Sequence, residues 1–76
     1  MIPADVIEFS KDAGASSIEE LELVSGEIAY LLVYDGQMIG LPTYLHYVDG
    51  VAMPSTAKES MALFSDPAYM GEDWEQ

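Results

Sequence analysis

The chain contains a single histidine, His46, which is the side chain best suited to proton transfer near neutral pH. It lies in the segment T-Y-L-H-Y-V, whose alternation predicts a strand with His46 on the same face as Tyr44 and Val48. General-base catalysis also needs an oriented nucleophile, and no serine lies in a recognisable nucleophile-elbow or triad context. We therefore interpret His46 as a structural histidine and predict a protein that is not an enzyme and has no catalytic residues.

Carboxylates and glycines could together form a cation or phosphate site, but their spacing here fits neither. Asp35-Gly36 and Asp49-Gly50 lack the D-x-[DN]-x-[DN]-G spacing of a calcium-binding loop. Gly36, Gly40 and Gly50 fall at predicted turns or bends, so they do not form a glycine-rich phosphate-binding loop. The chain has no cysteine, which excludes a disulfide framework and a thiolate metal site. We predict no metal and no cofactor.

Charge is the most unusual property of the composition. The 76 residues include 14 acids and only two bases, Lys11 and Lys58, for a formal net charge of -12. Nucleic acids and anionic membranes both require cationic groups on the protein, so we predict that it binds neither directly. The N-terminal segment MIPADVIEF has no basic region before its apolar residues, which argues against a secretory signal. We predict a cytoplasmic protein, acting in the host cytoplasm if a phage encodes it.

Two helices are predicted to position these residues. Residues 2–13 place apolar side chains at spacings of three and four, which is the period of a helix with one buried face. A second helix is predicted to begin with the capping box Thr56-Ala57-Lys58-Glu59 and to end at Asp66-Pro67. A similar capping pattern at residues 17–20 predicts one further helical turn.

The segments between the helices favour strands. Strands are predicted at residues 21–23, 27–34, 37–48 and 51–53. Asp35-Gly36 and Asp49-Gly50 are the turn signals, because a type I′ hairpin needs positive φ at both central residues. Gly40 and Pro42 interrupt the third segment, which predicts an edge strand or a bend there.

This order predicts a single α+β domain over residues 1–76. We expect a small antiparallel β-meander of about three to four strands, with the N-terminal and C-terminal helices packed on one face. Residues 66–76 are predicted to be an extended acidic tail. Because helices on one side cover only one face, the uncharged middle should have a buried face and an exposed face.

The distribution of the acids suggests a function in binding. They flank a middle that is rich in tyrosine, so negative charge would surround an apolar centre, imitate a nucleic-acid backbone and attract a basic groove. Apolar and aromatic side chains in the centre would then supply short-range affinity. The predicted partner-binding residues are Glu19, Glu20, Glu22, Asp35, Asp49, Glu72, Asp73, Tyr34, Tyr47 and Trp74.

In size, acidity and lack of catalytic groups, the chain resembles small inhibitors carried by phages and mobile elements. These include anti-CRISPR and anti-restriction proteins, some of them DNA mimics, and acidic immunity proteins that block nuclease toxins. The segment Glu59-Ser60-Met61-Ala62-Leu63 is similar to a stretch of a phage inhibitor of uracil-DNA glycosylase, and the similarity is confined to these five residues. The resemblance implies an inhibitor of a basic nucleic-acid-binding protein or nuclease complex.

Three alternatives stay open. The protein could be a structural or assembly module that forms a homodimer through its uncharged sheet face. Its acidity could serve solubility alone, although mixed charge serves that purpose equally well. Its acidity could also reflect a halophilic source, where protein surfaces are rich in acids and poor in lysine.

Overall fold

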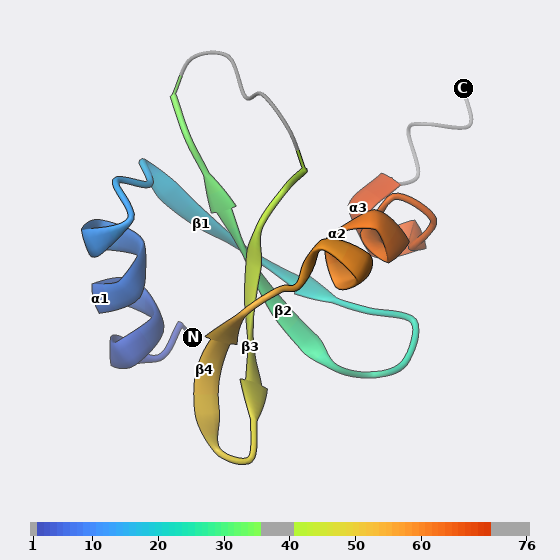
Figure 1. Cartoon of the computed structure of the whole chain (residues 1–76), viewed down its shortest axis with the longest axis horizontal. Helices are drawn as coiled ribbons and strands as arrows, with labels where there is room; N and C mark the ends of the chain where they lie inside the picture. Colours follow the sequence, from blue (N-terminus) through green and yellow to red (C-terminus); the bar gives the residue numbers. More distant parts are fainter. Residues whose placement is uncertain (1, 36–40, 71–76) are drawn as a thin grey trace.

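The computed structural model describes residues 2–35 and 41–70. The elements in order are α1 (Ala4–Asp12), β1 (Ser17–Glu22), β2 (Ile28–Val33), β3 (Tyr44–Val48), β4 (Val51–Pro54), α2 (Ala57–Leu63) and α3 (Pro67–Met70). The strands form one antiparallel sheet in the order β1-β2-β3-β4 (Figure 1). The α+β class and the meander are therefore confirmed. No helix within the described residues has the length and apolar character needed to cross a membrane.

The helices lie on opposite faces of the sheet, so the prediction that both pack on one face is wrong. The buried cluster on the α1 face consists of Val6, Tyr30, Leu32 and Leu45. The buried cluster on the α2 face consists of Ala29, Leu31, Tyr44 and Leu63. The physical reason is β2, whose sequence IAYLLV is apolar at every position and therefore requires a cover on each side. Figure 1 shows α1 and α2 on the two sides of the sheet.

The two longer helices begin largely as their sequences predict. Val6 is fully buried on the inner side of α1, and Ile2 and Phe9 pack against the same cluster. At the start of α2, the Thr56 side chain accepts a hydrogen bond from the backbone of Glu59, whose carboxylate accepts one from the backbone of Thr56. The predicted capping box is confirmed. Residues 17–20, by contrast, belong to strand β1 and form no helical turn.

The connection between β2 and β3 is longer than the sequence predicts. A two-residue turn at Asp35-Gly36 would place Tyr30 opposite Leu41, whereas Tyr30 pairs with Leu45. The predicted tight hairpin is therefore wrong. Within residues 41–70, pairing with β2 begins after Pro42, where the N–H of Leu32 donates to the carbonyl of Thr43 at 3.0 Å. Proline cannot donate to a ladder, which explains why the regular strand starts beyond it.

The turn between β3 and β4 is the two-residue hairpin that its sequence predicts. Val48 pairs directly with Val51, and the turn residues Asp49 and Gly50 have φ values of 53° and 81°. Positive φ at both positions is the requirement of a type I′ turn. The hairpin therefore has a defined geometry at the end of the sheet remote from the β2–β3 connection (Figure 1).

Strand β3 changes its surroundings along its length. Tyr44, Leu45 and His46 are buried, although alternate residues point to opposite faces, because both faces are covered at that end. Tyr47 and Val48 are exposed. The boundary between core and surface thus runs across the strand, and the prediction of one buried and one exposed face is corrected accordingly.

Candidate functional site

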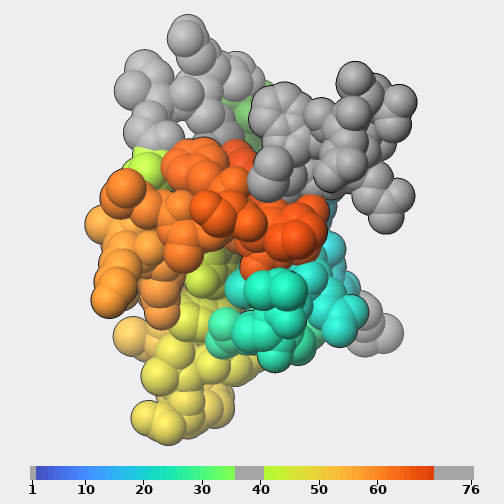
Figure 2. Space-filling view, turned by 90° about the vertical axis from the view of Figure 1, so that its right-hand side faces the viewer, coloured from blue at the N-terminus to red at the C-terminus, as the bar shows by residue number. Residues whose placement is uncertain are grey.

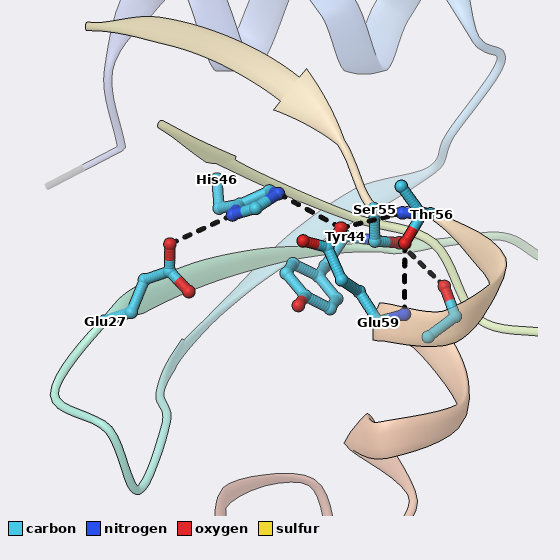
Figure 3. Close-up of polar contacts among 7 residues, drawn as sticks. Glu27, Tyr44, His46, Ser55, Thr56 and Glu59 are labelled. Atoms are coloured by element: carbon cyan, nitrogen blue, oxygen red, sulfur yellow. Dashed lines mark hydrogen bonds and ion pairs between the residues drawn. The ribbon is translucent and has the colours of Figure 1, made fainter. Parts of the chain in front are cut away.

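His46 is the centre of a polar cluster between the sheet and α2. Its Nδ1 lies 2.9 Å from Oε2 of Glu27, and its Nε2 lies 3.4 Å from Oε1 of Glu59. The imidazole is buried, whereas the two carboxylates are partly exposed. Figure 3 shows the ring between the two carboxylates, one from the segment just before β2 and the other from the first turn of α2. The cluster therefore connects three parts of the fold through one side chain.

The number of hydrogen bonds that His46 can donate to Glu27 and Glu59 depends on the protonation of its ring. A carboxylate is an acceptor only, and a neutral imidazole carries hydrogen on one nitrogen alone. Glu27 and Glu59 can therefore both accept hydrogen bonds from His46 only when the ring is an imidazolium. With a protonated ring, the arrangement is a charge-assisted link between two acids and one imidazolium. Neither ring nitrogen is turned toward a hydroxyl that it could deprotonate.

Glu59 both caps α2 and contacts His46. Hydrogen bonding from the backbone N–H of Thr56 is the main factor that lowers the pKa of Glu59, with the nearby His46 contributing in the same direction and partial burial opposing both. The carboxylate also lies beside Tyr44, whose ring meets the His46 ring edge-on with centroids 5.3 Å apart. Burial, and then the negative charge of Glu59, raises the pKa of Tyr44. These contacts attach the start of α2 to β3.

The serine hydroxyls near this cluster are engaged with one another. Ser55 Oγ lies 2.7 Å from Ser60 Oγ and accepts a hydrogen bond from the backbone N–H of Tyr44 at 3.1 Å. Across residues 2–35 and 41–70, every buried side-chain nitrogen and oxygen has a hydrogen-bond partner. The described residues also contain no group of three or more His, Asp or Glu side chains arranged to hold a metal ion. The buried polar atoms of the cluster thus form a network in which each has a hydrogen-bond partner.

The acids predicted to bind a partner occupy separate parts of the surface. Glu19, Glu20 and Glu22 are exposed along β1, which is an edge strand. Asp35 and Asp49 are also exposed, but Asp35 follows the end of β2 that pairs with the start of β3, whereas Asp49 lies in the turn after β3, at the opposite end of the sheet. The structure therefore brings together the three glutamates of β1 and separates the two aspartates from one another. Glu72 and Asp73 lie outside the described residues.

Two of the three predicted aromatic anchors are tied into the fold. Tyr34 is half-buried and packs against the core cluster on the α1 face. Tyr47 is 37% exposed, and its hydroxyl donates to Oδ1 of Asp5 on α1 at 2.6 Å. This hydrogen bond is the main factor that raises the pKa of Tyr47 to about 12. The third residue, Trp74, lies outside the described residues.

The sequence did not point to Glu27 or Glu59 as partners of His46. They are separated from it by 19 and 13 positions, so no local spacing relates the three residues. Their approach depends on the β2–β3 register and on the position of α2, which packs on the α2 face through Leu63. The capping box predicts that Glu59 turns back toward Thr56, and this was the one available signal.

No protein-family model, no curated protein and no solved structure matches this chain.

Proposed function

We propose that the protein is a non-catalytic inhibitor that binds a basic, nucleic-acid-handling protein or nuclease complex and occupies the groove meant for DNA or RNA. It acts in the cytoplasm of a host cell, as a phage anti-CRISPR or anti-restriction protein or an immunity protein does. The observation that carries the proposal is strand β1, where Glu19, Glu20 and Glu22 are exposed on an edge of the sheet.

The geometry of β1 supports mimicry of a phosphate backbone. An extended chain advances about 3.3 Å per residue, which is close to the rise of about 3.4 Å per phosphate along one strand of duplex DNA. Glu20 and Glu22 lie on the α1 face of the strand and Glu19 on the α2 face. The edge therefore presents carboxylates on both sides, at axial intervals of about 3.3 Å from Glu19 to Glu20 and about 6.6 Å from Glu20 to Glu22, which are about one and two phosphate steps of a nucleic-acid strand.

The balance of the remaining charges favours a basic partner over a general role in solubility. Within the described residues, Glu27 and Glu59 lie within ion-pair distance of His46, whereas Glu19 and Glu22 are exposed on β1. The carboxylates of Glu19 and Glu22 thus contribute to the surface field that an approaching protein meets. Such a field accelerates association with a basic surface and weakens as salt rises.

The proposal is tested by affinity purification from host lysate at low and high salt, with the captured proteins identified by mass spectrometry. We expect the protein to capture basic nucleic-acid-binding proteins at low salt and to retain progressively less of them as the salt concentration increases. Recovery of only neutral or acidic partners would contradict the proposal, as would a captured complex whose affinity is the same at both salt concentrations.

A pair of matched variants tests whether β1 provides the charge. Glu19→Gln with Glu22→Gln removes two carboxylates from the edge strand, and Glu8→Gln with Asp12→Asn removes two exposed carboxylates from α1. Both variants have the same net charge. We expect the β1 variant to weaken binding to the identified partner about tenfold and the α1 variant much less. Equal losses would show that only total charge matters.

A further inference from the structure

The β3–β4 hairpin exposes a small apolar surface, which we call the hairpin patch and define as Val48, Val51 and Met53. These residues are 44%, 57% and 45% exposed, respectively. Val48 pairs directly with Val51, and Met53 pairs with His46, so all three lie on the α2 face of adjacent strands. The hairpin patch is therefore continuous, although its residues come from two strands.

No described element covers the hairpin patch. Leu63 of α2 packs against Ala29, Leu31 and Tyr44, toward the other end of the sheet. In Figure 2 the hairpin, in yellow, extends below the orange and red helices and faces the viewer without cover. Figure 1 also places it at the end of the sheet opposite to the β2–β3 connection.

The hairpin patch lies on a backbone that the fold holds in place. The type I′ turn fixes the tip, with φ values of 53° at Asp49 and 81° at Gly50. At the base, His46 connects β3 to Glu27 and Glu59. A rigid contact surface loses little conformational entropy on binding, which increases the affinity available from a small apolar area.

The charges around the hairpin patch identify the kind of partner. Asp49 is exposed at the tip, and Glu27 and Glu59 lie on either side of His46, which pairs with Met53. An apolar centre with an acidic rim matches a partner that presents apolar side chains among lysines and arginines. The rim would then contribute attraction and the three apolar side chains the desolvated contact.

A second copy of the chain is a poor match for the same surface. Each copy carries a formal net charge of -12, so association brings two acidic rims together. Extension of the sheet across β4 is also unfavourable, because Pro54 has no N–H for a fifth strand. The occupant that fits is therefore basic.

We propose that the hairpin patch is the apolar contact site for the basic partner and accepts a partner segment in which apolar and basic side chains alternate. The inference rests on the proposed function, because it names the surface that holds that partner. It assigns the short-range contact to residues on the edge of the sheet opposite to β1. Glu19 shares the α2 face with the hairpin patch, and the four strands are spaced by about 4.8 Å, so one protein interface of ordinary size can reach from the hairpin patch to Glu19.

The test uses two synthetic peptides of equal length and charge, one alternating lysine with valine and the other lysine with serine. Their affinities for the full chain are measured by fluorescence anisotropy, and their site by amide chemical-shift changes. We expect the lysine–valine peptide to bind about tenfold more tightly and to shift the amides of residues 46–53. Both affinities should fall as salt increases.

Two double variants with the same residue changes at different sites show where the lysine–valine peptide binds. Val51→Thr with Met53→Gln changes the hairpin patch without altering charge, and Val24→Thr with Met61→Gln makes the same two changes at other exposed sites. We expect the first variant to abolish the preference for the lysine–valine peptide and the second to keep it. Circular dichroism and thermal unfolding establish that both variants are folded.

The remaining outcomes separate the inference from the proposed function. Equal, salt-dependent binding of the two peptides would overturn the hairpin patch as the contact and leave the proposed function intact. Absence of binding by either peptide would count against the proposed function itself. A dimer in light scattering that the Val51→Thr and Met53→Gln variant dissociates would also overturn the inference, because it would identify a second copy as the occupant.

Discussion

At the scale of single residues, the acids of this protein have two distinct roles. Asp5, Glu27, Glu59 and Asp66 make hydrogen bonds that connect one element to another or cap a helix. Glu8, Asp12, Glu19 and Glu22 are exposed. The first group stabilises the fold through specific geometry, whereas the second contributes mainly to the surface potential. Variants of the two groups should therefore differ in their effects on stability and on binding.

Tyr47 provides the first prediction. Its hydrogen bond to Asp5 and the negative charge of Asp5 both favour the neutral phenol, which raises the pKa from 10.0 to about 12. Because the folded-state pKa exceeds the unfolded value, this stabilisation is complete below pH 10 and is lost as pH rises toward 12. Besides the raised Tyr44, an absorbance titration of tyrosinate should show a late group that moves to lower pH in Asp5→Asn and is missing in Tyr47→Phe. Identical curves for the parent and Asp5→Asn would contradict the assignment.

Glu59 provides a prediction at acidic pH. Its pKa is lowered from 4.5, chiefly by the hydrogen bond from the backbone of Thr56, so it stabilises the fold above pH 4.5 and ceases to do so as pH falls through its folded-state pKa. Glu59→Gln keeps an acceptor for the capping box but loses the titration. Urea unfolding at neutral and acidic pH should show a smaller acid-dependent loss for Glu59→Gln than for the parent or for Glu8→Gln. A loss of equal size in all three proteins would refute this role.

At the scale of elements, the sequence predicted local structure well where one signal acted alone. The capping box of α2, the apolar face of α1 and the Asp49-Gly50 hairpin are all present. Errors arose where tertiary pairing overrode a local signal. The capping pattern at residues 17–20 was overridden by pairing of Ser17 and its neighbours with β2, and the Asp35-Gly36 turn by the β2–β3 register. The position of α2 depends on the apolar second face of β2, which alternation alone does not reveal.

The β3–β4 hairpin provides the prediction at this scale. Gly50 has φ of 81°, and an added Cβ would meet no atom within 4 Å, so Gly50→Ala should destabilise the protein through backbone strain alone. We expect a loss of about 1 kcal/mol in the free energy of unfolding, measured by urea denaturation. Asp49→Asn should have an effect of only a few tenths, since asparagine also tolerates positive φ. Comparable stability of Gly50→Ala and the parent would contradict the type I′ assignment.

At the scale of the whole molecule, charge is the dominant property. The charge of -12 is carried by a chain of only 8.3 kDa, and the exposed acids of the described residues lie on α1, on β1, just before and after β2, and in the β3–β4 turn. The sequence predicted this acidity fully, but it could not predict which acids would also make internal contacts. Glu27 and Glu59 contact His46 only because the fold brings three distant segments together.

Self-repulsion leads to a prediction for the whole chain. Like charges in a small volume oppose the compact state, and salt reduces their repulsion over a Debye length of about 10 Å at 0.1 M. The melting temperature measured by calorimetry should therefore rise with sodium chloride concentration. Replacing Glu19 and Glu22 with lysine lowers the net negative charge and should reduce this dependence. A melting temperature that does not change with salt would show that the acids are already compensated.

The central claim is that the protein takes the place of nucleic acid on a basic partner. The most direct measurement is a competition experiment with the captured partner, in which labelled duplex DNA or RNA is titrated with the protein and anisotropy and complex mass are recorded. We predict mutual exclusion, with the nucleic acid fully displaced at saturation by the parent and less effectively by the Glu19→Gln and Glu22→Gln variant. A stable complex containing partner, nucleic acid and this protein together would contradict the claim.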